Sequence, residues 1–107
     1  MTDVVKAVPQ SFGRTPDGVP VDLYELINPS GMRVAICTYG ARIIRWMVPD
    51  RAGRFENVIL GYDALNPYLE TRSYFGCVVG RYANRISRGR FVLEGKTIQL
   101  SKNEGEN

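Results

Sequence analysis

Turn-forming residues recur along this sequence at intervals too short to leave room for a long helix. Residues 28–31 carry Asn, Pro and Gly at the first, second and fourth positions, which is typical of a type I turn. Residues 50–53 repeat this turn chemistry, and Gly95 separates two short apolar segments near the carboxyl end. Because a chain divided in this way forms short antiparallel strands most readily, the sequence predicts an all-β fold, either a sandwich or a barrel.

The segments between these turns have the alternation and the β-branched or aromatic content of strands. Met32, Val34 and Ile36 occupy every second position, so we expect them to share the face that meets a core. Ile44 and Trp46 are expected to share a buried face of the next strand in the same way. The expected strands span residues 11–14, 21–27, 32–38, 41–48, 55–60, 74–79, 90–93 and 97–100, and residues 63–68 are expected to form one helical turn.

Length and composition place the chain among ordinary globular proteins. Its 107 residues, 44% hydrophobic and 23% charged, suit one domain or a piece of one. No apolar run approaches the roughly 20 residues of a spanning helix, and the first residues do not resemble a signal peptide, so we expect no membrane and a cytoplasmic protein. The net charge of +3 comes from scattered arginines among acidic residues, which argues against a nucleic-acid partner.

The sequence contains two cysteines and no histidine. Cys37 and Cys77 both lie in apolar surroundings, so we expect buried free thiols. Without histidine or a Cys-x-x-Cys pair a zinc site is not expected, and a cysteine nucleophile would lack its usual activating base. We therefore expect no metal site.

Asn84 and Arg85 are the candidate binding residues, within the run Gly-Arg-Tyr-Ala-Asn-Arg-Ile at 80–86. An amide offers a donor and an acceptor, and a guanidinium offers a rigid fork of donors, so the pair suits a ligand rich in hydroxyl groups. Adjacent strand residues face opposite sides, so both side chains reach one pocket only if the backbone bends there. The alternative is that Arg85 pairs with a surface carboxylate and Asn84 is a turn residue. Trp46 is more readily a core residue than a stacking platform.

With these residues in their order, the chain resembles the N-terminal portion of the aldose 1-epimerase (galactose mutarotase) family. The run at 80–86 carries most of the resemblance, supported by Phe12-Gly13, Tyr39-Gly40-Ala41, Leu60-Gly61-Tyr62 and Phe75-Gly76. The resemblance implies a large antiparallel β-sandwich, incomplete here because the chain is truncated, with residues 1–107 as part of a single domain and residues 1–20 as an N-terminal arm. It also implies interconversion of the α and β anomers of aldoses such as galactose or glucose, with no metal and no organic cofactor. Asn84 and Arg85 would bind sugar hydroxyls.

The family's catalytic groups, a histidine acid and a glutamate base, have no counterpart in this sequence. Glu104 and Glu106 match a loop near the family's cleft entrance, not its base. We therefore expect no catalytic residue and an inactive isolated chain. The alternatives are a non-catalytic carbohydrate-binding module or remnant, and a small basic β domain that binds RNA. Strand edges left uncovered by a partial sandwich would also favour self-association.

Overall fold

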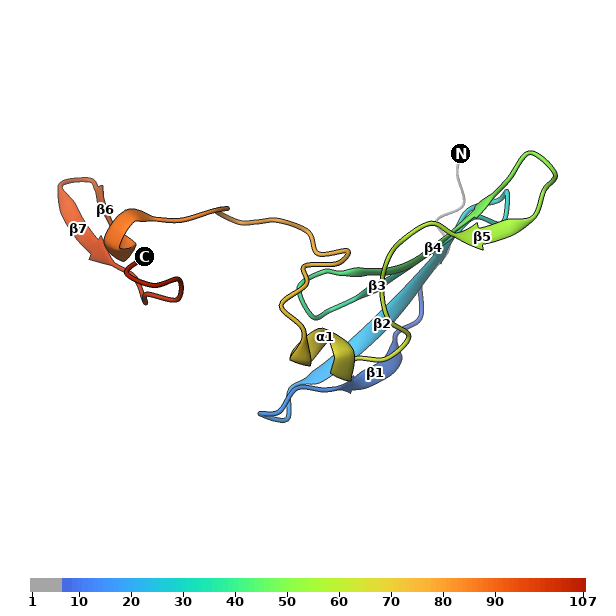
Figure 1. Cartoon of the computed structure of the whole chain (residues 1–107), viewed down its shortest axis with the longest axis horizontal. Coiled ribbons are helices and arrows are strands. Elements are labelled where there is room, and N and C mark those ends of the chain that lie inside the picture. The colour runs from blue at the N-terminus through green and yellow to red at the C-terminus, as the bar shows by residue number, and fades with distance from the viewer. Residues whose placement is uncertain (1–6) are drawn as a thin grey trace.

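The structure, a computed structural model, describes residues 7–107 and is built almost entirely from antiparallel strands (Figure 1). Five strands form one sheet in the order of the sequence, and two more form a separate hairpin. The strands of the sheet are β1 (Gln10–Arg14), β2 (Pro20–Ile27), β3 (Arg33–Cys37), β4 (Ile43–Pro49) and β5 (Phe55–Asn57). A short helix, α1 (Asn66–Glu70), and a 3₁₀ turn, η1 (Ser87–Gly89), precede the hairpin of β6 (Arg90–Leu93) and β7 (Lys96–Gln99). The all-β prediction is confirmed. The expected strands form within about two residues of their predicted ends, except that 55–60 is a strand only over Phe55–Asn57 and 74–79 is not a strand.

The predicted turns form with the hydrogen bonds that their residue types favour. The Asn28 side chain accepts a hydrogen bond from the Met32 amide at 2.9 Å, and the Gly31 amide donates to the Asn28 carbonyl at 2.9 Å. Asp50 accepts from the amides of Ala52 and Arg54 at 2.7 and 2.9 Å. These amides lower the pKa of Asp50, with the Arg54 amide as the largest cause. Side-chain acceptors of this kind fix the register of the hairpins that build the sheet.

The core lies on one face of the sheet, where the α1 region covers it. Leu65 and Tyr68 of this region pack onto side chains from the middle strands, and Tyr68 is 1% exposed. Phe12, Tyr39, Tyr62, Leu69 and Phe75 surround this cluster and are partly buried. The fully buried apolar residues are Val21, Leu23, Ala35, Cys37, Ile44, Leu65 and Tyr68.

The prediction that Val34 and Ile36 face the core is wrong, because the opposite face of β3 meets it. Ala35 and Cys37 are buried, whereas Val34 and Ile36 are only half-buried. The strict alternation expected for β4 is also wrong, because the register shifts between Ala35 and Ile36. This irregularity leaves Ile44 unpaired and buried in the core, while Trp46 pairs with Val34 on the opposite face and is half-buried. A bulge breaks the period of two, which no alternation pattern reveals.

Residues 74–79 do not form the buried strand that their apolar composition predicted. Val78 and Val79 are 62% and 73% exposed, and Cys77 is half-buried rather than buried. Gly76 has a φ of +67° and the Cys77 amide donates back to the Tyr74 carbonyl at 3.2 Å, so the chain turns here. The glycine changes the direction of the chain, and the exposed valines follow from that turn.

The hairpin β6–β7 lies apart from the sheet, at the end of an extended segment (Figure 1). The radius of gyration is 18.2 Å, whereas a compact chain of this length has about 13 Å. The strands β1 and β5 are the edges of the sheet, so self-association through uncovered edges stays a prediction. Within residues 7–107 no helix has the length and apolarity needed to cross a membrane. Of the expected arm at residues 1–20, positions 1–6 lie outside the described residues.

Candidate functional site

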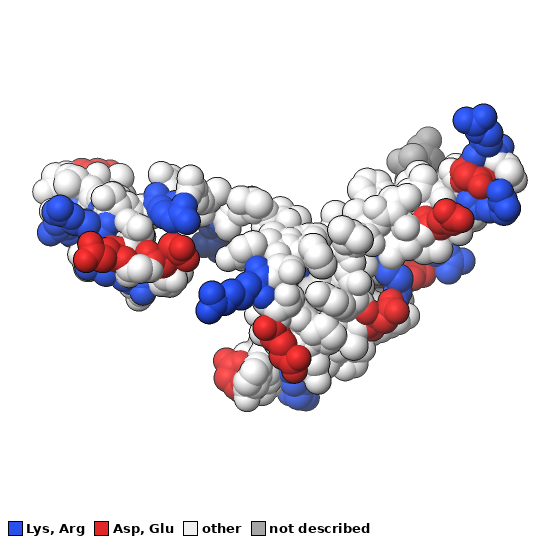
Figure 2. All heavy atoms as spheres, in the orientation of Figure 1, with Lys and Arg blue, Asp and Glu red and all other residues white. Residues whose placement is uncertain are grey.

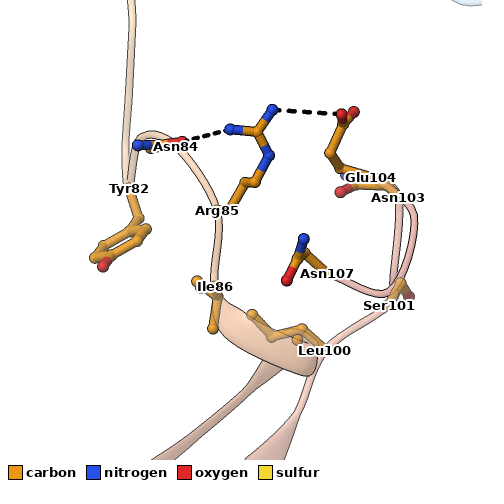
Figure 3. Close-up of a pocket in the computed structure, with 10 residues that line it drawn as sticks. Tyr82, Asn84, Arg85, Ile86, Leu100, Ser101, Asn103, Glu104 and Asn107 are labelled. Atoms are coloured by element: carbon orange, nitrogen blue, oxygen red, sulfur yellow. Dashed lines mark hydrogen bonds and ion pairs between the residues drawn. The ribbon is translucent and has the colours of Figure 1, made fainter.

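The residues at 82–86 and the loop at 100–107 meet around a pocket of about 270 Å³ beside the hairpin (Figure 3). The first segment has no regular secondary structure and runs from the sheet toward η1. The second segment leaves β7 and turns back, with the Asn103 amide donating to the Asn107 carbonyl at 2.9 Å. The pocket is lined by Tyr82, Asn84, Arg85, Ile86, Gly89, Leu100, Ser101, Asn103, Glu104 and Asn107.

The backbone bends at Asn84, as the joint use of two adjacent side chains requires. Asn84 has a φ of +69°, the left-handed region that asparagine tolerates better than most residues. The bend brings both polar groups together, since Arg85 Nη1 donates a hydrogen bond to Asn84 Oδ1 at 3.3 Å (Figure 3). The structure therefore places the two predicted residues side by side at one pocket, and their role toward a ligand stays a prediction.

Glu104 completes the polar group from the other side of the pocket. Its Oε1 lies 3.5 Å from Arg85 Nη2, and the two side chains are 64% and 60% exposed (Figure 3). An exposed ion pair at this distance contributes little, about 0–1 kcal/mol, so a ligand can replace it at low cost. Glu104 thus orients the Arg85 guanidinium, which can still donate hydrogen bonds to a ligand.

A second and larger hollow, of about 620 Å³, adjoins the pocket and shares Tyr82, Asn84, Arg85, Asn103 and Glu104 with it. Its remaining wall is largely apolar and includes the half-buried Cys77 and the exposed Val78 and Val79. A ligand in this region would meet polar and charged side chains on one side and apolar or aromatic surface on the other. That combination is typical of small-molecule sites, in which a few polar groups fix the orientation.

Several other predicted candidates lie elsewhere. Trp46 belongs to the sheet and lines neither hollow, which agrees with its interpretation as a packing residue. Tyr39 packs against the core, and Glu106 does not line the pocket. Sequence reasoning missed Asn107, whose side chain lines the pocket and accepts a hydrogen bond from the Arg88 amide at 3.4 Å. Its contact depends on how the loop closes, so no local sequence signal could have found it.

The side chains that line the pocket offer hydrogen-bonding groups, and one of them, Glu104, carries a carboxylate. The described residues include no cluster of three or more His, Cys, Asp or Glu side chains that could hold a metal ion. The whole sequence lacks histidine, the side chain that most often transfers protons near neutral pH. On the face that Figure 2 presents, acidic side chains are interspersed with the arginines and lysines. The side chains that line the pocket offer amide, guanidinium, hydroxyl and carboxylate groups for hydrogen bonding, and their role toward a ligand stays a prediction.

Comparison with known proteins connects this geometry to one family. The family model for aldose 1-epimerase matches residues 22–107. The galactose mutarotase of Bos taurus is 44% identical over 108 residues, covering 100% of this chain and 30% of that protein. A probable aldose 1-epimerase of Arthroderma benhamiae is 47% identical over 79% of this chain and 20% of that protein. The aldose 1-epimerase of Haemophilus influenzae is 41% identical over 91% of this chain and 28% of that protein.

A solved structure extends the similarity to the fold. The crystal structure of galactose 1-epimerase from Lactobacillus acidophilus matches with a TM-score of 0.68 and 27% identity, over 95% of this chain and 29% of that chain. The prediction of an all-β, sandwich-like fold of the mutarotase type is thereby confirmed. The chain spans less than a third of the length of these relatives. Within that span, the chain belongs to the aldose 1-epimerase family.

Proposed function

We propose that this chain is the sugar-holding part of an aldose 1-epimerase, which interconverts the α and β anomers of a free aldose such as galactose or glucose. The observation that carries the proposal is the pairing of Asn84 and Arg85 at one pocket, 3.3 Å apart, within a chain of this family. The Asn84 amide accepts and donates, while the Arg85 guanidinium only donates. Neighbouring hydroxyl groups of a sugar can each find a partner in this pair.

The proposal assigns binding and not proton transfer to these residues. Opening a sugar ring requires a base at the anomeric hydroxyl and an acid at the ring oxygen. The family's acid is a histidine, and the sequence contains none. Glu104 is exposed and faces Arg85, and the resemblance matches it to a loop near the cleft entrance and not to the family's base. The isolated chain is therefore expected to bind an aldose without accelerating its mutarotation.

The test is a galactose titration of the isotope-labelled chain, followed by the amide signals of residues 82–86 in NMR spectra. We expect millimolar affinity, because the pocket is open and its key side chains are more than half exposed. Arg85→Ala should weaken binding by about tenfold, the value of a charged hydrogen bond. Arg85→Lys should weaken it nearly as much, because an ammonium lacks the planar fork.

Arg90→Ala is the matched control, since Arg90 is an exposed arginine outside this pocket and its loss changes the net charge equally. Equal losses for Arg85→Ala and Arg90→Ala would show a general charge effect and would contradict the assignment. Polarimetry on the same samples completes the experiment. A mutarotation rate well above the buffer rate would show that the chain holds its own catalytic acid.

A non-catalytic carbohydrate-binding protein is the second candidate, favoured by the absence of histidine. The two proposals differ in what happens when the isolated chain is combined with the C-terminal portion of a family member. Restored mutarotation that depends on Arg85 supports the epimerase. Sugar binding with no restored rate supports the binding protein.

A further inference from the structure

Arg42 is the one charged residue that is fully buried within residues 7–107, with 8% of its surface exposed. It lies immediately before β4, and its Nη1 atom donates hydrogen bonds to the carbonyl oxygens of Ser73 at 3.3 Å and Phe75 at 3.1 Å. Its guanidinium carbon lies 5.6 Å from the ring centre of Tyr39 and 5.3 Å from that of Tyr68. The charge therefore rests between two aromatic faces and points at the main chain of another segment.

A buried arginine without a carboxylate partner is costly. None of the ion pairs in the described part of the chain includes Arg42, and its Nε has no hydrogen-bond partner there. Two carbonyl oxygens and two aromatic faces compensate only part of the desolvation of a guanidinium. The hydrogen bonds from Arg42 attach residues 73–75 to the sheet.

The main chain makes a second attachment at the same place. The Ile43 amide donates to the Gly76 carbonyl at 2.8 Å, and Gly76 has a φ of +67°. A Cβ atom at Gly76 would overlap the Ile43 carbonyl oxygen, so the two backbones approach more closely than any other residue permits. Arg42 and Gly76 thus fasten one short segment, residues 73–76, to the start of β4.

Residues 73–76 are the last segment that several interactions hold to the sheet before the candidate site. Val78 makes one long main-chain hydrogen bond to Gly40, at 3.4 Å, and residues 79–86 follow without secondary structure. Asn84 and Arg85 lie on this free stretch, so its starting point and direction limit where they can be placed. If the hydrogen bonds at residues 73–76 opened, the position from which residues 79–86 extend would no longer be fixed.

We propose that Arg42 is a positioning residue, which fixes residues 73–76 to the sheet and thereby sets where the stretch that carries Asn84 and Arg85 begins. The effect on sugar binding rests on the function proposed above, whereas the attachment itself does not. Arg42 lines neither of the two hollows that contain Asn84, although it lines a third hollow together with Glu104. Its proposed effect on Asn84 and Arg85 is through the backbone of residues 73–76.

The experiment compares Arg42→Met, Arg42→Lys and Gly76→Ala with the control Arg45→Met in the whole chain. Arg45 also lies at β4, but its side chain is 35% exposed and reaches only Asp63, at 3.8 Å. The first readout is hydrogen exchange of the Ile43 amide, relative to the Val58 amide, which is bonded to Trp46 in the same sheet. The second readout is the galactose affinity.

Loss of the attachment should increase exchange at Ile43 by about tenfold or more in Arg42→Met, with Val58 unchanged, because two hydrogen bonds to a charged group are removed. Galactose affinity should fall severalfold, and Arg42→Lys should recover part of both effects. Gly76→Ala, which breaks the same attachment from the other side, should give similar losses, and the double variant should add little to either. Arg45→Met should leave both readouts as in the unsubstituted chain.

Unchanged protection of Ile43 in Arg42→Met would overturn the attachment. Faster exchange with unchanged galactose affinity would overturn its influence on the site. A chain that binds no galactose even without substitution would refute the proposed function, and exchange at Ile43 would still decide the attachment. Where Arg42→Met prevents folding, Arg42→Lys carries the test, because lysine retains the charge and donor hydrogens but lacks the planar guanidinium that lies over the rings of Tyr39 and Tyr68.

Discussion

The Tyr68 hydroxyl group offers a sharp test of how the core is organised. Tyr68 lies in α1, is 1% exposed, and packs edge-on against Tyr62 with ring centres 5.1 Å apart. Its hydroxyl oxygen accepts a hydrogen bond from the Tyr62 amide at 2.8 Å. Tyr68→Phe removes this oxygen and leaves the ring contacts in place, so the substitution isolates one buried hydrogen bond.

The expected loss follows from the fate of the Tyr62 amide. A typical hydrogen bond contributes about 1 kcal/mol net, and a buried donor left without an acceptor costs about 1–3 kcal/mol. The surroundings are only partly buried, so water can reach the amide in part, and we expect a loss of about 1–2 kcal/mol. For a domain of this size that corresponds to a fall in Tm of roughly 5–10 °C.

Thermal unfolding followed by circular dichroism measures this effect. Tyr74→Phe is the control, since Tyr74 is 80% exposed and loses the same oxygen into water. The control should leave Tm within error of the unsubstituted chain. Equal Tm values for all three proteins would refute the reasoning, because the Tyr62 amide would then have found another partner at no cost.

Two further predictions concern the turns. Glu94 has a φ of +50° and precedes Gly95 at +75° in the two-residue loop of β6–β7, so Glu94→Asn should stabilise the hairpin by about 0.5–1 kcal/mol; slower amide exchange across the hairpin would show it. The pKa of Asp50 is lowered chiefly by the Arg54 amide, so its contribution to stability is complete above its ordinary pKa of 3.8 and is lost as the pH falls through the lower folded value. Tm measured between about pH 6 and about pH 2 should therefore fall less steeply in Asp50→Ala than in the unsubstituted chain, and parallel curves would contradict the assignment.

Much of the fold could be predicted because its signals are local. The turns at Asn28 and Asp50 form as their side chains dictate, and the hairpin around Gly95 pairs Phe91 with Ile98 as expected. Asn84 and Arg85 could be found for the same reason, since they are adjacent in a distinctive run of residues. Their proximity to Glu104, nineteen positions away, was not predictable from any local pattern.

The errors share one cause, which is that burial depends on what covers a segment. Val78 and Val79 have the composition of a buried strand and are exposed, because the turn at Gly76 leads them away from the sheet. Ile44 and Trp46 are two positions apart and face opposite sides, because a bulge intervenes. A hydrophobic pattern indicates which residues favour burial, but it does not show which segment of the chain covers them.

The sequence by itself determined the all-β class, most of the strand and turn order and the adjacency of the candidate residues Asn84 and Arg85, since these depend on backbone preferences and side-chain chemistry over a few neighbouring positions. The tertiary structure decided which sheet face holds the core, where Arg42 is buried and which side chains meet Asn84 and Arg85. Those outcomes depend on contacts between residues far apart in the chain, such as Arg42 with Ser73, and contacts of that kind exist only once the chain has folded.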